Sequence, residues 1–346
     1  MISAEGEGSS VADASRYACL SAEGLQVDGL SIALAMHGRE ALALEDVSLD
    51  IAPGRTLCVA GESGSGKSLL ALALAGLLPE VARVAAGQAW LDGQCLLGAE
   101  AVASRRQRAG RDIGIVFQEP MTALNPVLKI GSQLAEVPRL HGHGARQGQA
   151  MALAMLERVC IAQPQSIMQA YPHQLSGGQR QRVLIAMALI LSPRLVIADE
   201  PTTALDVTLQ AEILSLLKAL QKEQGTALLF ITHDLAVVAE IADHVVVLYA
   251  GRVVESAPAA ELFGRPRHPY TRGLLAARPP LDGGGGARAL LAAIEGTVPS
   301  PGRWPRGCGF SPRCALATAR CRAEPPALEA RDDGAAPHRV ACFESP

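Results

Sequence analysis

One eight-residue segment combines the residue types that bind the phosphates of a nucleotide. Its residues are Gly61, Glu62, Ser63, Gly64, Ser65, Gly66, Lys67 and Ser68. They fit the pattern G-x-x-x-x-G-K-[ST], in which backbone N–H groups surround the phosphates and glycines permit close approach. The lysine of this pattern supplies a cation to the β- and γ-phosphates, and the final hydroxyl is a ligand for Mg²⁺. We therefore predict a site for a nucleoside triphosphate and Mg²⁺.

The sequence on either side of this segment predicts the local structure that phosphate binding requires. Residues 56–60 form a short apolar run typical of a strand, and residues 69–75 are strong helix formers. The helix is expected to begin directly after the loop, so that the positive end of its dipole faces the phosphates. The alternative, a chance cluster of glycines in a turn, does not account for this order of elements.

Apolar strand-like runs alternate with helical stretches from about residue 25 to residue 270. The runs are residues 56–60, 113–117, 195–198, 227–232 and 245–249, and the long helical stretches are residues 151–160, 178–191 and 209–224. This alternation predicts an α/β fold with a parallel sheet covered by helices. Because the runs are continuously apolar, we expect these strands to be buried on both faces.

Four polar side chains follow these runs and suit the hydrolysis of a phosphate anhydride. A carboxylate after a buried strand lies at the crevice where α/β proteins bind ligands, so Asp199 can bind Mg²⁺ together with Ser68. Glu200 can act as general base toward water; the alternative is a solvated acid after a strand. We expect His233 to contact the γ-phosphate and Gln118 to bind the metal ion and sense the attacking water. Their alternatives are an ordinary loop histidine and a surface amide.

A second glycine-rich segment opens a helical stretch. Its residues are Leu175, Ser176, Gly177, Gly178 and Gln179. Small residues and free N–H groups at a helix N-terminus form an anion site. Together with the phosphate loop and the polar residues above, this LSGGQ segment closely resembles the nucleotide-binding subunits of ABC transporters, and the resemblance covers about residues 25–275.

The resemblance implies a phosphate-loop NTPase core with a helical signature subdomain that hydrolyses ATP. It implies that Ser176, Gly177 and Gly178 complete the ATP site of a second ATPase subunit, which is either a copy of this chain or a paralogue, and that Gln179 and Asp206 also belong to the nucleotide-binding residues. The family usually stacks adenine on an aromatic residue. Here the corresponding stretch is aliphatic, with Leu34 at the expected position, so no aromatic stack is expected.

Three further stretches resemble the ATP-binding subunits of bacterial oligopeptide and dipeptide importers, a group that includes nickel importers. They are residues 118–126, residues 268–275 and a tail containing residues 308–342. The resemblance implies two integral membrane permease subunits, an extracytoplasmic substrate-binding protein that acts indirectly, and a peripheral place at the cytoplasmic face of the inner membrane. Di- or oligopeptides are the expected cargo, and nickel is the alternative.

Composition disfavours a nucleic-acid partner. The chain has 346 residues, a formal net charge of −3 and 3% aromatic residues, so it offers neither a basic field nor many stacking platforms. A single phosphate loop without heptads disfavours a soluble ABC ATPase of DNA repair or translation, and the LSGGQ segment disfavours a phosphate-loop kinase. The longest apolar stretch, residues 183–191, is too short to span a bilayer.

Four cysteines crowd into the C-terminal tail. They are Cys308, Cys314, Cys321 and Cys342, spaced C-x₅-C-x₆-C-x₂₀-C. This spacing matches neither zinc ribbons nor ferredoxins, yet four cysteines in a segment with few apolar residues suit a Cys₄ site that stabilises the fold. The resemblance to peptide importers favours a [4Fe–4S] cluster; zinc and unligated thiols are the alternatives. Arg303, Arg306 and Arg313 are available to dock the tail on the catalytic domain or the permease.

We divide the chain into three parts. Residues 1–24 are rich in Ser, Gly, Ala and acidic residues, lack the pattern of a signal peptide, and are expected to form a flexible extension. Residues 25–275 are the expected ABC ATP-binding domain. Residues 276–346 comprise a glycine-rich linker, at residues 279–286, and the small Cys-rich extension.

Overall fold

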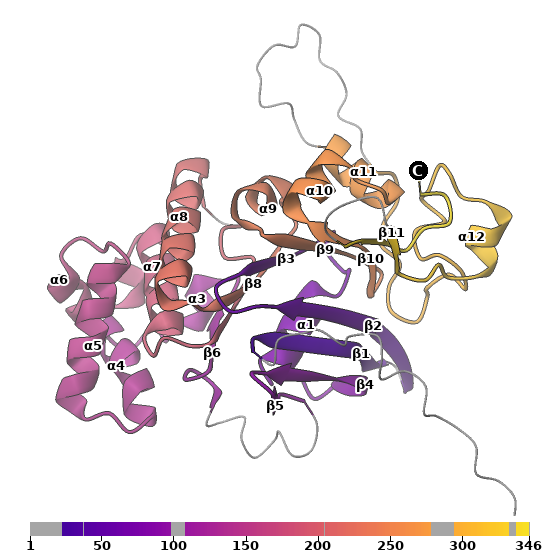
Figure 1. The fold of residues 1–346 in the computed structure, drawn as a ribbon. Coiled ribbons are helices and arrows are strands. Elements are labelled where there is room, and N and C mark those ends of the chain that lie inside the picture. Colours follow the sequence, from indigo (N-terminus) through magenta and orange to yellow (C-terminus); the bar gives the residue numbers. More distant parts are fainter. Residues whose placement is uncertain are drawn as a thin grey trace, which may run out of the picture.

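The computed structural model describes residues 23–36, 38–97, 108–203, 205–277, 294–331 and 337–345. The extension expected at residues 1–24 lies outside these ranges except for its last two residues. The linker expected at residues 279–286 lies wholly outside them. Figure 1 shows the arrangement of the helices and strands.

Within the described residues, an eight-stranded sheet has the order β11-β12-β10-β9-β3-β8-β7-β6. Its strands are β3 (Thr56–Ala60), β6 (Ile113–Val116), β7 (Leu195–Asp199), β8 (Ala227–Thr232), β9 (His244–Tyr249), β10 (Arg252–Pro258), β11 (Glu329–Arg331) and β12 (His338–Val340). The strands from β9 to β6 pair in parallel, whereas β10, β12 and β11 pair antiparallel. The predicted parallel sheet is therefore confirmed, and all five predicted strands are present.

The parallel strands are buried on both faces, as their continuous apolar runs predict. Every residue of β3 is buried. Leu57 and Leu229 pack on one face with α1 (Lys67–Leu74), and Cys58 and Phe230 pack on the other face with the longer helices. This two-sided burial fixes the carboxyl ends of the strands, where the polar residues follow.

A four-stranded antiparallel sheet covers α1 on the side away from the main sheet. Its order is β2-β1-β4-β5, with bounds β1 (Leu25–Met36), β2 (Arg39–Ile51), β4 (Ala82–Leu91) and β5 (Gln94–Cys95). Helix α1 contacts both sheets, and Leu44 and Leu70 are fully buried between them. The sequence did not lead us to expect this sheet, because bulges interrupt the pairing of β1 with both neighbours and obscure a simple alternation.

Apart from α1 between the sheets and α12 in the C-terminal extension, the helices form a lobe at one end of the molecule and a layer over the main sheet (Figure 1). Their bounds are α3 (Pro120–Ala123), α4 (Ile130–Leu140), α5 (Ala145–Arg158), α6 (Pro164–Gln169), η1 (Pro172–Gln174), α7 (Gly177–Leu189), α8 (Val207–Gln224), α9 (Leu235–Ile241), α10 (Ala259–Gly264), α11 (Pro269–Ala276) and α12 (Ala319–Ala323). The three long helices predicted from the sequence correspond to α5, α7 and α8. Helix α5 begins six residues earlier than predicted (145 against 151), after Gly144.

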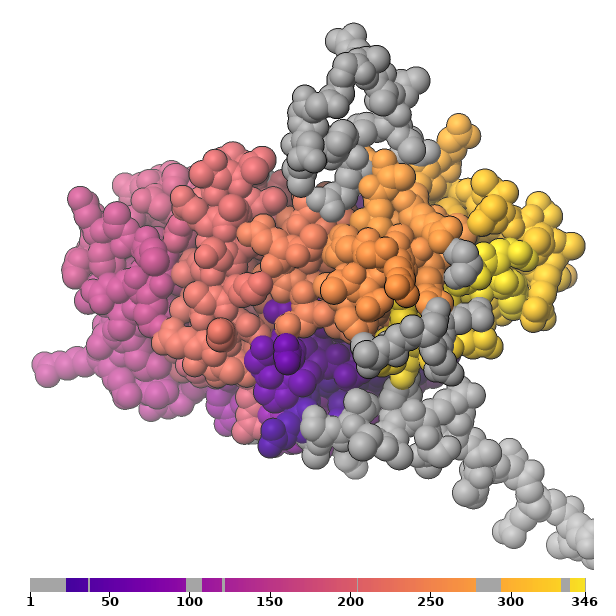
Figure 2. Space-filling view, turned by 45° about the horizontal axis from the view of Figure 1, so that its top comes forward, coloured from indigo at the N-terminus to yellow at the C-terminus, as the bar shows by residue number. Residues whose placement is uncertain are grey.

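The C-terminal residues form a small extension at the end of the molecule opposite the helical lobe (Figure 2). Strand β12 pairs with β10, and the side chains of Val340 and Phe310 are buried. Phe310 belongs to the core of the main domain. The extension therefore packs on the apolar core of its neighbour, which explains how a segment with so few apolar residues is ordered.

Candidate nucleotide-binding site

The phosphate loop joins the end of β3 to the first turn of α1. Gly61 has φ 150°, and a Cβ atom there would lie 2.3 Å from the carbonyl oxygen of Leu248. Gly66 has φ 107°, and its Cβ would lie 2.5 Å from a methyl group of Leu44. Both positions require glycine, and no side chain caps the N-terminus of α1. The loop thus presents free backbone donors at a helix N-terminus, which suits phosphate.

Lys67 lies across this loop. Its ammonium group donates hydrogen bonds to the carbonyl oxygens of Gly61 and Glu62, each at 2.8 Å. Burial lowers the pKa of Lys67, and the nearby carboxylates, Glu200 first, counteract this. Because two neutral carbonyl oxygens hold the ammonium group, phosphate oxygens can replace them with stronger, charge-assisted bonds.

Asp199 and Ser68 meet at the edge of the loop and fit a magnesium ion. The Ser68 hydroxyl is hydrogen-bonded to the Asp199 carboxylate, and the second oxygen of that carboxylate, Oδ1, is buried without a partner. Burial raises the pKa of Asp199, Ser68 opposes the shift, and the charge of Glu200 adds to it. The hydroxyl of Ser65 is also buried without a partner. Such hard oxygen donors suit Mg²⁺ and its phosphate ligands.

Three donors surround the carboxylate of Glu200. Oε1 lies 3.1 Å from Nδ1 of His233, and Oε2 accepts from Nε2 of Gln118 at 3.2 Å and from the hydroxyl of Thr203 at 2.9 Å. Glu200 also has φ 47°, a left-handed conformation that is uncommon for a residue with a side chain. The structure thus brings the three predicted residues Gln118, Glu200 and His233 together. Thr203 was missed, although it lies only three residues after Glu200 in the same turn.

The LSGGQ segment opens α7 in the helical lobe, whereas the phosphate loop leads into α1, which lies between the two sheets (Figure 1). Ser176 accepts from the backbone N–H of Gln179, whose side chain accepts from the backbone N–H of Ser176. Gly178 packs on α8, because a Cβ there would lie 2.6 Å from Leu209. A Cβ on Gly177 would meet no atom within 4 Å. Asp206 accepts from the backbone N–H of Leu209 and caps α8.

Comparison with known proteins agrees with this geometry. The ABC transporter family matches residues 44–203, and the family described as "Oligopeptide/dipeptide transporter, C-terminal region" matches residues 254–321. The dipeptide transport ATP-binding protein DppD of Escherichia coli is 44% identical over 311 residues, which are 90% of this chain and 94% of DppD. The chain belongs to the ATP-binding subunits of ABC transporters. The ABC subunit is therefore an ATPase coupled to transport.

Further relatives of this ABC subunit agree. A Brucella melitensis protein, provisionally named for peptide import and ATP binding, is 48% identical over 317 residues, 88% of this chain and 93% of that protein. Among solved structures, the cassette MJ0796 in a post-hydrolysis state with ADP and Pi has a TM-score of 0.59 and 29% identity, covering 68% of this chain and 98% of that chain. The cassette cbiO1 of Clostridium perfringens has a TM-score of 0.60 and 28% identity, and the match covers 70% of this chain and 91% of that chain.

Two residues that the sequence did not assign to the site contact Glu62 in the phosphate loop of the ABC subunit. Its backbone N–H donates to the hydroxyl of Tyr270 at 2.8 Å. Its carboxylate pairs with the guanidinium of Arg313 at 2.5 and 3.1 Å. Tyr270 belongs to the stretch 268–275, which marked the importer branch, and Arg313 was expected only to dock the tail. Their positions on the loop depend on contacts across the fold that no local pattern reveals.

The four tail cysteines line one small cavity of the ABC subunit, together with His268 and Phe310. They form no disulfide, and the backbone N–H of Cys308 donates to the carbonyl oxygen of Cys321 at 2.8 Å. Burial raises the pKa of the Cys342 thiol to about 11. In the part of the chain that the structure describes, no group of three or more His, Cys, Asp or Glu side chains is arranged to hold a metal ion, so the predicted iron–sulfur cluster has no support from the geometry.

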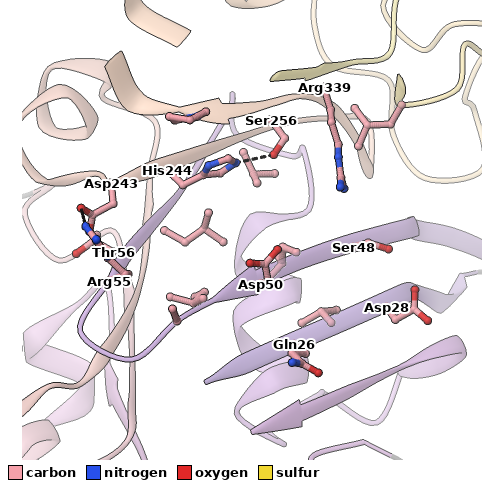
Figure 3. Close-up of a pocket in the computed structure, with 18 of the residues that line it drawn as sticks. Gln26, Asp28, Ser48, Asp50, Arg55, Thr56, Asp243, His244, Ser256 and Arg339 are labelled. Atoms are coloured by element: carbon pink, nitrogen blue, oxygen red, sulfur yellow. Dashed lines mark hydrogen bonds and ion pairs between the residues drawn. The ribbon is translucent and has the colours of Figure 1, made fainter. Parts of the chain in front are cut away.

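A cavity of about 540 Å³ lies away from the phosphate loop, between the antiparallel sheet and strands β9 and β10 (Figure 3). His244 and Ser256 are hydrogen-bonded there at 2.9 Å, and Asp50 and Arg339 line the same space. None of the phosphate-loop residues lines it, so we assign it no part in ATP binding.

In the described residues, the ABC subunit has no helix that is both long and apolar enough to cross a membrane.

Proposed function

We propose that this ABC subunit powers the import of di- or oligopeptides across the inner membrane. The observation that carries the proposal is the match of residues 254–321 to the C-terminal region of oligopeptide/dipeptide transporters, on a chain in which Gln118 and His233 contact Glu200. The DppD and Brucella proteins, which span almost the whole chain, are named for dipeptide transport and peptide import. We place the subunit at the cytoplasmic face, on two permease subunits that receive cargo from an extracytoplasmic binding protein.

The residues of the site divide the work of hydrolysis. Lys67 exchanges its bonds to the loop carbonyls for bonds to the phosphates. Asp199, Ser68 and Gln118 would hold Mg²⁺, and the ion would offset the charge of the β- and γ-phosphates. Glu200 accepts the proton of the attacking water as general base.

The donors around Glu200 aim its carboxylate at that water. Since Gln118 and Thr203 hold one carboxylate oxygen, the other faces His233 and remains in a fixed direction. His233 then contacts the γ-phosphate from the neighbouring strand end. Proton acceptance by Glu200 thus requires little rearrangement of the protein, and this lowers the activation free energy of ATP hydrolysis.

A second ATPase subunit is needed to complete each site. The helix that begins after Ser176 has open space around Gly177 in its first turn, so its N-terminus can approach a γ-phosphate bound to another subunit. We assign Gln179 and Asp206 to the same interface. The relative MJ0796 was solved as a dimeric cassette, which supports the arrangement.

The helical lobe is the docking site that we propose for the permease. Large apolar side chains are exposed on it: Val127 (75%), Leu128 (42%) and Leu140 (76%). They lie after Gln118 and on α4, where a helix of a membrane subunit can cover them. Movement of this lobe relative to the ATP site then couples hydrolysis to the permease by shifting its conformational equilibrium.

We propose that the tail cysteines hold a [4Fe–4S] cluster with a structural role. Four thiols around one cavity match the Cys₄ set of such a cluster. Since the described residues show no group arranged to hold a metal ion, the proposal rests on the shared cavity and the four thiols, and zinc remains the alternative. Anaerobic purification with iron, sulfide and zinc analysis tests this, and a folded protein with neither metal contradicts it.

Purification of the intact complex tests the proposed transport function. The tagged chain, extracted from membranes in detergent, is expected to bring down two permease subunits and an ATPase partner. After reconstitution in liposomes with the binding protein, di- or oligopeptides should accelerate ATP turnover and accumulate inside. Stimulation by Ni²⁺ alone, or recovery with ribosomes or DNA in place of permeases, would contradict peptide import.

A further inference from the structure

An ion pair joins the C-terminal extension to the phosphate loop. The guanidinium of Arg313 contacts both carboxylate oxygens of Glu62, at 2.5 and 3.1 Å, although the two residues are 251 positions apart. The Arg313 side chain is 6% exposed and that of Glu62 is 30% exposed. A bidentate pair with so little solvent around the arginine is stronger than an ordinary surface ion pair.

Arg313 is itself held in a fixed place. It donates to the carbonyl oxygens of Ile294 (3.0 Å) and Glu295 (2.8 Å), and its guanidinium lies 5.8 Å from the ring centre of Tyr249. The extension that carries it is anchored by a hydrogen bond of 2.7 Å between the buried side chains of His338 and Glu255. The guanidinium therefore has a defined position before any nucleotide arrives.

Glu62 is held at its main chain as well. Its N–H donates to the hydroxyl of Tyr270, whose side chain is fully buried. The ring centre of Tyr270 lies 4.7 Å from that of Tyr249 and 5.3 Å from that of Phe310. Phe310 and Arg313 belong to the same loop of the extension, between Cys308 and Cys314. This loop thus supports Glu62 from both sides, through an aromatic cluster and through an ion pair.

The charge of Glu62 makes this support matter for ATP. An unpaired carboxylate in a loop that surrounds phosphates would repel them and would compete for Lys67. We propose that Arg313 is a positioning residue for ATP binding: it neutralises Glu62 and holds it away from the phosphates. The C-terminal extension is then a part of the nucleotide site. This role of Arg313 rests on the proposed ATP site and is independent of the transported cargo.

A double-mutant cycle tests the proposal. The variants Arg313→Gln, Glu62→Gln and the double variant would be compared by Mg-ATP affinity and by KM and kcat of the full chain in its complex. We expect Arg313→Gln to weaken ATP binding by about tenfold, mainly in KM, because Glu62 becomes free. In the Glu62→Gln background the same arginine change should alter affinity less than about twofold, since no carboxylate remains to be controlled.

Controls separate this role from a loss of folding. Arg322→Gln removes an exposed arginine of the same extension to which no role is assigned, and it should leave KM unchanged. Arg313→Lys keeps the charge and should recover part of the affinity. The defect of Arg313→Gln should also shrink in high salt, which screens Glu62. Two results would overturn the proposal. One is an Arg313→Gln variant that binds Mg-ATP with wild-type affinity. The other is an arginine change that weakens Mg-ATP affinity by the same factor in the Glu62→Gln background as in the wild type.

Discussion

The imidazole Nδ1 of His233 lies 3.1 Å from the carboxylate Oε1 of Glu200. The two residues follow adjacent parallel strands, β8 and β7, whose register places Asp199 opposite Ile231. Because the carboxyl ends of parallel strands share one edge of the sheet, the pairing of the strands brings the two side chains together. The chemistry of the site is thus positioned by the sheet.

The first prediction concerns the general base. Glu200→Gln should reduce ATP turnover by about 100-fold or more, because an amide keeps the shape of the carboxylate but cannot accept the proton. Binding of Mg-ATP should remain, so the closed dimer should accumulate. Turnover and nucleotide retention of the purified complex measure both effects, with the surface variant Glu223→Gln as control. Near wild-type turnover would refute the assignment of Glu200.

The second prediction concerns the composite site. Gly177→Asp should lower ATP turnover by about tenfold or more, because a carboxylate would repel the γ-phosphate of the opposing subunit. Gly264→Asp is the matched control, because it adds the same carboxylate at an exposed glycine outside the LSGGQ segment, where a Cβ meets no atom within 4 Å. ATP binding to the phosphate loop of the same chain should persist in both variants. Full activity of an isolated monomer, independent of concentration, would contradict the two-subunit site.

The elements that the sequence predicted well are those with a local pattern. Continuous apolar runs located β3 and β8 at their observed ends, and glycine spacing located the phosphate loop. The elements that it missed depend on distant partners. Strand β12 has three residues and exists through its pairing with β10, and Arg313 reaches Glu62 across 251 positions. No window of sequence contains both members of either pair, so local patterns could not reveal them.

The third prediction concerns pH. Burial lowers the pKa of His244 below 6.5, and Arg339 and His338 add to the shift, whereas Asp50 opposes it. A histidine with a lowered folded-state pKa stabilises the fold above pH 6.5, and this stability is lost as the pH falls and the unfolded state takes up protons. His268, whose pKa burial lowers to about 3, acts in the same direction. The free energy of unfolding should therefore fall as the pH drops below 6.5.

His244→Gln tests that prediction. Glutamine can keep the hydrogen bond to Ser256 without titrating. The slope of unfolding free energy against pH, from denaturant melts between pH 5 and 7, should become shallower by at most about 1.4 kcal/mol per pH unit. His173→Gln, which changes an exposed histidine, should leave the slope unchanged. An identical slope in His244→Gln and wild type would show that His244 does not contribute.

The last prediction joins the cysteine site to the ATP site. Cys314 directly follows Arg313 in the loop whose guanidinium holds Glu62, so loss of a cluster ligand should loosen both. Cys314→Ser should lose most of the bound iron and also raise the KM for ATP several-fold, as Arg313→Gln does. Cys160→Ser, which changes an exposed cysteine at the end of α5, is the control for thiol loss alone.

The measured iron content and KM for ATP distinguish the outcomes. If iron is lost while KM stays at the wild-type value, the loop holds Arg313 without help from the cluster. If the KM of Cys314→Ser rises but wild-type protein without metal binds ATP normally, the Cys314 side chain acts through packing. The cluster then has no part in positioning Glu62. A joint loss of iron and of ATP affinity in Cys314→Ser supports a cluster that stabilises the phosphate loop through Arg313, provided that wild-type protein stripped of iron shows the same rise in KM and recovers when the cluster is reconstituted.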